Sequence, residues 1–258
     1  MNNVLVKIGP ITIYWYSVLI LVGFLLAYYM ASKESKKEGT TEFLNDLIMH
    51  IMIWGILGAR VYYVIFNFGA YQNNLLDIFK IWEGGLAIYG GVIAGLLTLI
   101  YQAKKREQSI VKTTDMIATG LILAQAIGRW GNFFNQEAHG GVVSLEFLKS
   151  IHLPTFIIEG MNINGVYYHP TFLYESVWCL LGFIILLVLR KLTKRMKGIL
   201  TFTYFIWYGT GRFFIEGLRT DSLYLGPIRI SQLVSIVLIV IGLIGIIISI
   251  VKGKKNEK

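Results

Sequence analysis

The 258-residue chain has few charged residues, only four prolines and a single cysteine. Charged residues make up 15% of the sequence and hydrophobic residues 55%, whereas a soluble domain is about 25% charged, which excludes an ordinary soluble fold. Cys179 lies among apolar residues and, being alone, excludes an intramolecular disulfide and a cysteine-held metal cluster. The aspartates are scattered, one per segment, which argues against a carboxylate cluster for a divalent metal. We therefore expect a membrane protein that uses no metal or other cofactor.

Several segments approach the length of about 20 apolar residues that an α-helix needs to cross a hydrocarbon core. Those without any charge are residues 11–31, 84–101 and 231–251, and those with charges are residues 43–66, 113–130, 171–189 and 199–217. The first is longer than the apolar region of a secretory signal and has no small-residue cleavage site after it, so we expect a retained anchor. The sequence predicts an all-α polytopic membrane protein with seven transmembrane helices.

The loops between these spans alternate sharply in positive charge. The loops expected on the cytoplasmic side carry Lys33, Lys36, Lys37, Lys104, Lys105, Arg106, Lys112, Arg190, Lys191, Lys194, Arg195, Lys197, Lys252, Lys254, Lys255 and Lys258. The opposite side carries only Lys7, Lys80, Lys149, Arg219 and Arg229. Because positive loops stay in the cytoplasm, we expect the N-terminus outside and the C-terminus in the cytoplasm. The net charge of +9 then faces anionic membrane lipids and does not indicate nucleic acid.

One long segment, residues 131–170, is expected on the outer side between the fourth and fifth spans. It contains Pro154 and the turn-like sequence Asn162-Ile163-Asn164-Gly165, which predicts a small extracytoplasmic head of loops with a hairpin. No repeat or second soluble domain is apparent. We expect residues 1–258 to form a single membrane domain, with residues 131–170 inserted as the head.

Three arginines, Arg60, Arg129 and Arg212, lie within the predicted spans. A charge in the bilayer costs about 2.5 to 3.5 kcal/mol, so each is a candidate functional residue that needs an anionic partner. Gln125, Arg129 and Asn132 are four and three residues apart and so share one helical face. An arginine fork, an amide and nearby glycines are suited to phosphate; the alternative is a helix end whose arginine reaches the interface.

A second polar face is predicted in the sixth span, where Tyr208, Arg212 and Glu216 are four residues apart and Arg219 follows. Two interpretations are open: an Arg212–Glu216 ion pair that only stabilises the bundle, or a carboxylate that orients Arg212 toward a ligand. Glu175, near the start of the fifth span, is expected to pair with one of the arginines.

Two further features have ordinary structural explanations. Gly91 and Gly95 in the third span have the spacing of closely packed membrane helices, which explains them about as well as a ligand does. Tyr16 and its aromatic neighbours near the start of the first span are typical of residues that anchor a helix at the membrane interface.

The sequence of residues 128–137, Gly-Arg-Trp-Gly-Asn-Phe-Phe-Asn-Gln-Glu, followed by Gly140, resembles the signature of prolipoprotein diacylglyceryl transferases. Further matches are Gly9-Pro10, Trp15-Tyr16, Gly58-Ala59-Arg60, Trp82-Glu83-Gly84-Gly85, His169-Pro170-Thr171, Tyr174-Glu175 and Arg212-Phe213-Phe214-Ile215-Glu216. Each match alone is weak, but the ordered set spans nearly the whole chain and is specific.

The resemblance implies a multi-pass enzyme of the bacterial cytoplasmic (inner) membrane. Such an enzyme moves the diacylglyceryl group of phosphatidylglycerol onto the lipobox cysteine in the signal peptide of a preprolipoprotein, and releases glycerol phosphate. Arg129 matches the family's phospholipid-binding arginine, and Arg212 its other essential arginine. The other candidate catalytic residues are Tyr89, Tyr208 and His169, and the other candidate substrate-binding residues are Tyr16, Arg60, Asn132, Glu137, Gly140, Tyr174, Glu175, Glu216 and Arg219.

The chain departs from the family pattern at Tyr89, where several members have a histidine proposed as the base. A tyrosine with a pKa near 10 is a poor base at neutral pH. Either the histidine is not an obligatory base, or His169, Glu137 or another group replaces it here.

Two other functions are alternatives to that of such a transferase. A transporter or channel for an anionic solute or lipid also needs buried arginines and glycine-rich helices. A lipid phosphotransferase normally needs a carboxylate cluster that holds a divalent metal, which the scattered aspartates do not predict.

Overall fold

The computed structural model describes residues 2–9, 11–193 and 196–255. Long helices dominate these residues: α1 (Trp15–Glu38), α2 (Thr41–Phe66), α3 (Ile88–Lys105), α4 (Ile110–Asn135), α7 (Thr171–Leu192), α8 (Ile199–Leu218) and α9 (Ile230–Lys255). Five of them, α1, α2, α4, α7 and α9, are long and apolar enough to cross a membrane. Helices α3 and α8 are 18 and 20 residues long and are not among these five. The mostly helical fold and these five helices agree with the predicted multi-pass membrane protein, whereas the number of seven spans stays a prediction.

Several helix boundaries differ from the predicted spans, and three of the differences have a local explanation. Residues 11–14, assigned to the first span, form strand β2 (Ile11–Tyr14), which pairs with β1 (Val4–Ile8), as their β-branched residues favour. The third span begins at Ile88 because Gly84 and Gly85 have φ of +93° and +72°, which an α-helix excludes. Helix α4 continues through Asn135, where Gln136 adopts a φ of +53°, so the first residues assigned to the head are helical.

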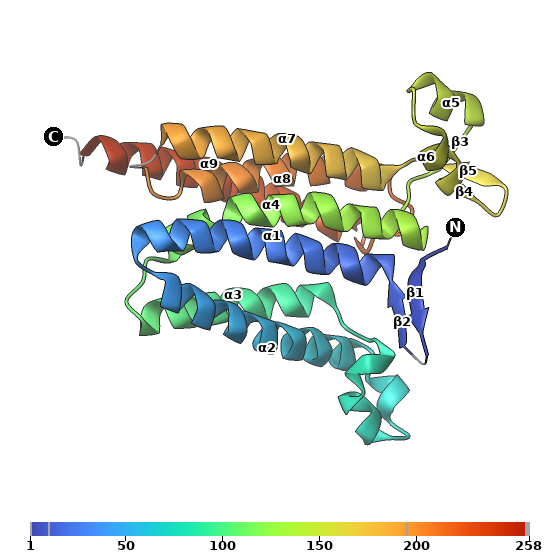
Figure 1. The fold of residues 1–258 in the computed structure, drawn as a ribbon, viewed down its shortest axis with the longest axis horizontal. Helices are drawn as coiled ribbons and strands as arrows, with labels where there is room; N and C mark the ends of the chain where they lie inside the picture. Colours follow the sequence, from blue (N-terminus) through green and yellow to red (C-terminus); the bar gives the residue numbers. More distant parts are fainter. Residues whose placement is uncertain (1, 10, 194–195, 256–258) are drawn as a thin grey trace. The chain divides into compact units, whose positions relative to one another are not determined.

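Two compact units make up the chain. The first comprises Met1–Ala31 and Thr114–Lys258, in which α1, α4, α7, α8 and α9 run side by side (Figure 1). Its core includes Ile122, Cys179 and Leu186, all 0–1% exposed, so Cys179 packs as an apolar residue. Glycine allows helices of this unit to approach each other closely. For example, a Cβ added at Gly120 on α4 would lie 2.7 Å from the Cα of Ala27 on α1.

A small head follows α4 within the first unit (Figure 1). Its elements are β3 (Val142–Val143), α5 (Leu145–Ser150), α6 (Thr155–Gly160), β4 (Asn162–Ile163) and β5 (Val166–Tyr168). The strands form an antiparallel sheet in the order β3-β5-β4, over a core that includes Leu148, Ile157 and Met161. The β4–β5 hairpin turns at Asn164 and Gly165, both at positive φ, as the sequence predicted. Outside the head, between α8 and α9, β6 (Tyr224–Leu225) pairs with β7 (Ile228–Arg229).

The second unit, Ser32–Thr113, is built on the packing of α2 against α3. A Cβ added at Gly90 would lie 2.3 Å from the Gly58 carbonyl oxygen, and one at Gly58 would lie 2.3 Å from the Ala94 Cβ. Gly90 therefore serves close helix packing, whereas a Cβ at Gly91 or Gly95, the two positions for which the sequence suggested this role, would come no closer than 3.4 Å to an atom of α2. Three 3₁₀ turns, η1 (Phe68–Tyr71), η2 (Leu75–Phe79) and η3 (Ile81–Glu83), connect the two helices. That residues 1–258 form a single domain stays a prediction.

Candidate functional site

One buried carboxylate joins the two arginines that the sequence placed in the fourth and sixth spans. Glu175, in the second turn of α7, is 2% exposed. Its Oε1 lies 2.7 Å from Nη2 of Arg129 on α4, and its Oε2 lies 3.0 Å from Nη1 of Arg212 on α8. The prediction that Glu175 pairs with an arginine is confirmed, and the structure shows that it pairs with both.

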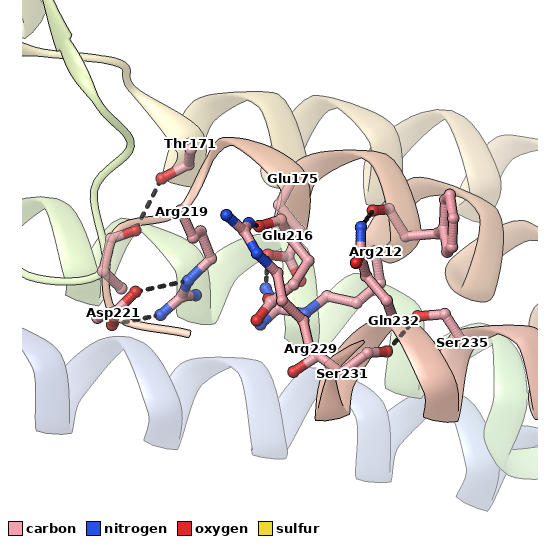
Figure 2. A network of polar contacts seen from close by, with 12 residues as sticks. Thr171, Glu175, Arg212, Glu216, Arg219, Asp221, Arg229, Ser231, Gln232 and Ser235 are labelled. Atoms are coloured by element: carbon pink, nitrogen blue, oxygen red, sulfur yellow. Dashed lines mark hydrogen bonds and ion pairs between the residues drawn. The ribbon is translucent and has the colours of Figure 1, made fainter. Parts of the chain in front are cut away.

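Glu216 is a second buried carboxylate beside Arg212. Its Oε2 lies 2.5 Å from Arg212 Nη2, one helical turn away along α8, and the residue is 1% exposed. The main-chain carbonyl of Glu216 accepts a hydrogen bond from Arg229, which precedes α9. Figure 2 shows Glu175, Arg212, Glu216 and Arg229 gathered where α7, α8 and α9 meet.

The charges of this cluster balance, and Arg129 is its most accessible member. Arg129 and Arg212 balance the charges of Glu175 and Glu216, which makes burial of all four groups tolerable. The Arg129 side chain is 23% exposed, whereas the Glu175 and Glu216 side chains are 3% and 1% exposed. The carboxylates are therefore the more deeply buried partners, and they hold the two arginines in place.

Asn132 and Glu137 continue the network at the end of α4. Arg129 Nη1 donates to Asn132 Oδ1 at 3.3 Å, and Asn132 Nδ2 donates to Glu137 Oε1 at 3.1 Å. Asn135 also donates to Glu137 Oε1 at 3.2 Å, and the Glu137 amide donates to the Asn132 carbonyl at 3.0 Å. Asn132, which was predicted to share a helical face with Arg129, thus links its guanidinium to Glu137 beyond the end of α4.

Gly140 lies where the chain leaves α4 and passes between α7 and α8. Its amide donates to the His169 carbonyl at 3.0 Å, and the next amide, of Gly141, donates to the Leu218 carbonyl at 3.1 Å. A Cβ at Gly140 would lie 2.6 Å from the His169 Cβ and 3.0 Å from the Leu218 carbonyl oxygen. The absence of a side chain lets this strand connect the head to the ends of both helices.

Replacing Gly140 with alanine is expected to lower the free energy of unfolding by about 1 to 3 kcal/mol, because two backbone segments must move apart. The measurement is the thermal unfolding midpoint in detergent, with limited proteolysis of the head. Gly141→Ala is the matched control, since nothing lies within 4 Å of a Cβ at Gly141. Equal midpoints for the two variants would contradict this packing role.

His169 and Tyr174 contact each other next to this strand. The His169 Nδ1 lies 3.2 Å from the Tyr174 hydroxyl. Burial lowers the pKa of His169 below its ordinary value of 6.5, so the imidazole is neutral at pH 7 and able to accept a proton.

Arg219 is held by Asp221 through two hydrogen bonds, from Nε at 2.9 Å and from Nη2 at 2.7 Å (Figure 2). Burial by itself would raise the pKa of Asp221, but the hydrogen bonds and charge of Arg219 outweigh it and lower that pKa below its ordinary value. Arg219 also bridges to Gly140, which links the end of α8 to the end of α4.

The other candidate tyrosines of the first unit, Tyr16 and Tyr208, lie beside α4. Tyr208 stacks on Tyr204, with ring centroids 5.7 Å apart, and its hydroxyl lies beside the Arg129 guanidinium. The Tyr16 ring packs on Gly131, where an added Cβ would lie 2.4 Å from the ring. Gln125, one turn before Arg129, donates to the Tyr204 hydroxyl at 2.9 Å.

The candidate residues of the second unit have a different environment. Arg60 is 7% exposed, and its guanidinium donates to the carbonyls of Ile78, Gly84, Gly85, Asp77 and Lys80 at 2.7 to 3.5 Å. The expectation that Arg60 needs an anionic partner is therefore wrong, because main-chain carbonyls of the loop before α3 satisfy it. Tyr89 is half-buried in the first turn of α3.

The sequence interpretation missed Arg229, which it counted as a loop charge. Its guanidinium reaches the end of α8 and contacts the Tyr224 ring, with the Tyr224 hydroxyl accepting from Nε at 3.0 Å. No helical spacing relates Arg229 to Glu216, because α8 ends at Leu218 and Arg229 lies in the second strand of the β6–β7 hairpin. Only the position of an arginine directly before an apolar span could have suggested a role.

Known proteins resemble this chain over almost its full length. The family model of prolipoprotein diacylglyceryl transferase matches residues 3–248. A phosphatidylglycerol–prolipoprotein diacylglyceryl transferase of Bacillus cereus (strain G9842) is 50% identical over 259 residues, and one of Bacillus mycoides (strain KBAB4) is 49% identical over 259 residues. Each alignment covers 100% of this chain and 96% of the relative. The chain belongs to the prolipoprotein diacylglyceryl transferase family.

Proposed function

We propose that this protein transfers the diacylglyceryl group of phosphatidylglycerol to the lipobox cysteine of a preprolipoprotein. The observation that carries the proposal is the match at about half identity, over the whole chain, to relatives that are named for this reaction. The Arg129–Glu175–Arg212 cluster, in which Arg129 is partly exposed, offers guanidinium groups that can bind an anionic phospholipid.

The reaction replaces a carbon–oxygen bond of the lipid with a carbon–sulfur bond, and the thiol proton passes to a base. The cysteine thiol loses its proton, and its sulfur attacks the sp³ carbon of the diacylglyceryl group that bears the phosphate. The carbon–oxygen bond breaks, its electron pair stays on the phosphate oxygen, and glycerol phosphate leaves while a thioether remains. Negative charge grows on the phosphate, and preorganised guanidinium groups in a water-poor site stabilise it. The acceptor supplies the nucleophile, so the buried Cys179 is not needed for the chemistry.

We assign the residues roles on this basis. Arg129 and Arg212 bind the phosphate. Glu175 and Glu216 orient the two arginines through ion pairs. Asn132, itself held by Glu137, fixes the orientation of the Arg129 guanidinium. Tyr16 and Tyr208 flank the lipid beside α4, while Gly140, Tyr174 and Arg219 hold the helix ends that surround it. His169, neutral at pH 7, is a candidate proton acceptor. Arg60 serves substrate binding only indirectly, by holding the loop before α3.

The test of function uses purified protein, phosphatidylglycerol and a peptide with a lipobox cysteine. Mass spectrometry of the peptide should show a gain of one diacylglyceryl unit, and a peptide with serine in place of that cysteine should show none. Transport of an anionic solute into vesicles without any change in the peptide mass would support the alternative of a transporter. Transfer of a phosphate-containing group would instead indicate a lipid phosphotransferase.

We further propose that all seven long helices span the bacterial cytoplasmic (inner) membrane, with the N-terminus outside and the C-terminus inside. The strong asymmetry of lysine and arginine between alternate loops supports this topology. Residues 136–170, which follow α4, then face the outside, where a preprolipoprotein presents its lipobox.

Labelling of single cysteines introduced at Lys36, Lys105, Lys194 and Lys255 is expected to occur from the cytoplasmic face only, and labelling at Ser150 from the outer face only. Lys194 lies outside the described residues. Cys179 is buried, so its labelling should be negligible. Labelling of Lys105 and Ser150 from the same face would contradict the topology.

Tyr89 is expected to donate a hydrogen bond and pack in the substrate cavity, and not to act as the base. Tyr89→Phe should therefore retain measurable transfer, and Tyr89→His should be tolerated, because a group that only donates a hydrogen bond and packs is more replaceable than a base. The measurement is the pH dependence of the initial rate, with Tyr101→Phe as a control at the exposed far end of α3. Complete loss of activity in folded Tyr89→Phe would assign the hydroxyl to proton transfer.

A further inference from the structure

Two tryptophans on adjacent helices, Trp178 of α7 and Trp207 of α8, are joined by reciprocal hydrogen bonds. Trp178 Nε1 donates to the main-chain carbonyl of Trp207 at 2.8 Å, and Trp207 Nε1 donates to the main-chain carbonyl of Trp178 at 2.8 Å. The two rings stack with centroids 4.3 Å apart and planes 16° apart. We call this pair the tryptophan clasp.

A glycine four residues after each tryptophan makes the clasp possible. A Cβ at Gly211 would lie 2.2 Å from Trp178 Nε1, and a Cβ at Gly182 would lie 2.4 Å from Trp207 Cδ1. In an α-helix the carbonyl of residue i faces the amide of residue i+4, so a side chain at i+4 would screen that carbonyl. Glycine exposes it to the partner indole. The pattern Trp-x-x-x-Gly therefore occurs on both helices, and each copy receives the ring of the other.

The clasp lies beside the ion pairs of the candidate site. Trp178 follows Glu175 by three residues on α7, which puts both on one side of the helix. On α8, Gly211 directly precedes Arg212, whose Nη1 lies 3.0 Å from Glu175. A slip of one residue along a helix is a shift of about 1.5 Å with a rotation of about 100°. Such a slip would remove Glu175 from Arg212.

We propose that the tryptophan clasp is a positioning device that sets the register of α7 on α8 and thereby holds Glu175 between Arg129 and Arg212. The proposal rests on the function proposed above. Apolar side chains in a membrane bundle tolerate sliding, whereas the two indole hydrogen bonds are directional and each is satisfied in one register only. The clasp acts through Glu175, and its own atoms do not contact the substrate.

The first test replaces both indoles by rings that cannot donate, in Trp178→Phe/Trp207→Phe. We expect kcat per folded enzyme to fall about 10- to 100-fold, as for a small misplacement of charge-stabilising groups, with the KM for phosphatidylglycerol nearly unchanged. Trp54→Phe is the matched control, because Trp54 is 54% exposed on α2. A variant that only melts earlier, with kcat per folded enzyme unchanged, would overturn the proposal.

A double-mutant cycle with Glu175→Gln tests whether the clasp acts through that carboxylate. In the Glu175→Gln background, the clasp substitutions should cause little further loss of kcat, because the two changes then affect the same interaction. Equal fold-losses in both backgrounds would show that the clasp affects the reaction by another route, and would overturn the proposal.

A distance measurement separates the failure of this proposal from the failure of the proposed function. Spin labels at cysteines introduced at Leu181 on α7 and Phe214 on α8, both exposed, report the register of the two helices without any substrate. We expect the clasp substitutions to shift or broaden the distance distribution. An unchanged distribution would contradict the register role even if the wild-type protein transfers lipid, whereas an inactive wild type with a changed distribution would contradict only the function.

Discussion

Arg129→Ala is expected to lower kcat by at least about 10²-fold, because it removes a preorganised cation from the position where phosphate charge develops. Its effect on stability should be small. Glu175 keeps its 3.0 Å ion pair with Arg212, so no buried carboxylate loses its last cation. Arg129 is also the more exposed of the two arginines, and its alanine variant opens space at an accessible position.

The measurements are steady-state transfer to a lipobox peptide and thermal unfolding in detergent, made on the same preparation. Arg106→Ala is a suitable arginine control, because its exposed ion pair with Asp46 should contribute at most about 1 kcal/mol. An Arg129→Ala variant that unfolds at a much lower temperature, and loses activity only in proportion, would make Arg129 a structural residue.

Arg212→Ala is expected to lose both activity and stability. Its guanidinium is the partner of Glu216, which is 1% exposed, and it shares Glu175 with Arg129. Removing one partner of a buried ion pair leaves an uncompensated charge and costs about 3 to 5 kcal/mol. The two arginines, similar in sequence context, should therefore differ in their effect on the unfolding temperature.

The double variant Arg212→Ala/Glu216→Gln separates the two effects of Arg212. Neutralising Glu216 removes the buried charge, so stability should largely return, whereas kcat should stay low because no cation replaces the guanidinium. Recovery of transfer together with stability would instead show that Arg212 only stabilises the bundle.

Local sequence patterns were sufficient to predict the long helices and most members of the charged cluster, but not Arg229 or the short helices α5 and α6. Long apolar runs have few structures open to them other than membrane-spanning helices, because backbone polar groups must be satisfied within the segment. Charges in such runs are costly and therefore rare, so Arg129, Glu175, Arg212 and Glu216 stand out within their apolar segments. Helix ends are less predictable: Gly84 and Gly85 continue an apolar run in the sequence, but their positive φ angles exclude them from the helix.

The partners of these charges were decided by tertiary structure. Sequence periodicity shows which residues share a face of one helix, and it correctly related Arg212 to Glu216 four residues later. It does not show how two helices are rotated and shifted against each other, because that depends on contacts between residues far apart in the sequence. Arg60 binding main-chain carbonyls, Glu175 shared by two arginines, and the reciprocal hydrogen bonds of Trp178 and Trp207 all depend on that register. Composition and spacing thus determined that this chain is a helical membrane protein with a few buried charges, whereas interhelical packing decided which of those charges meet.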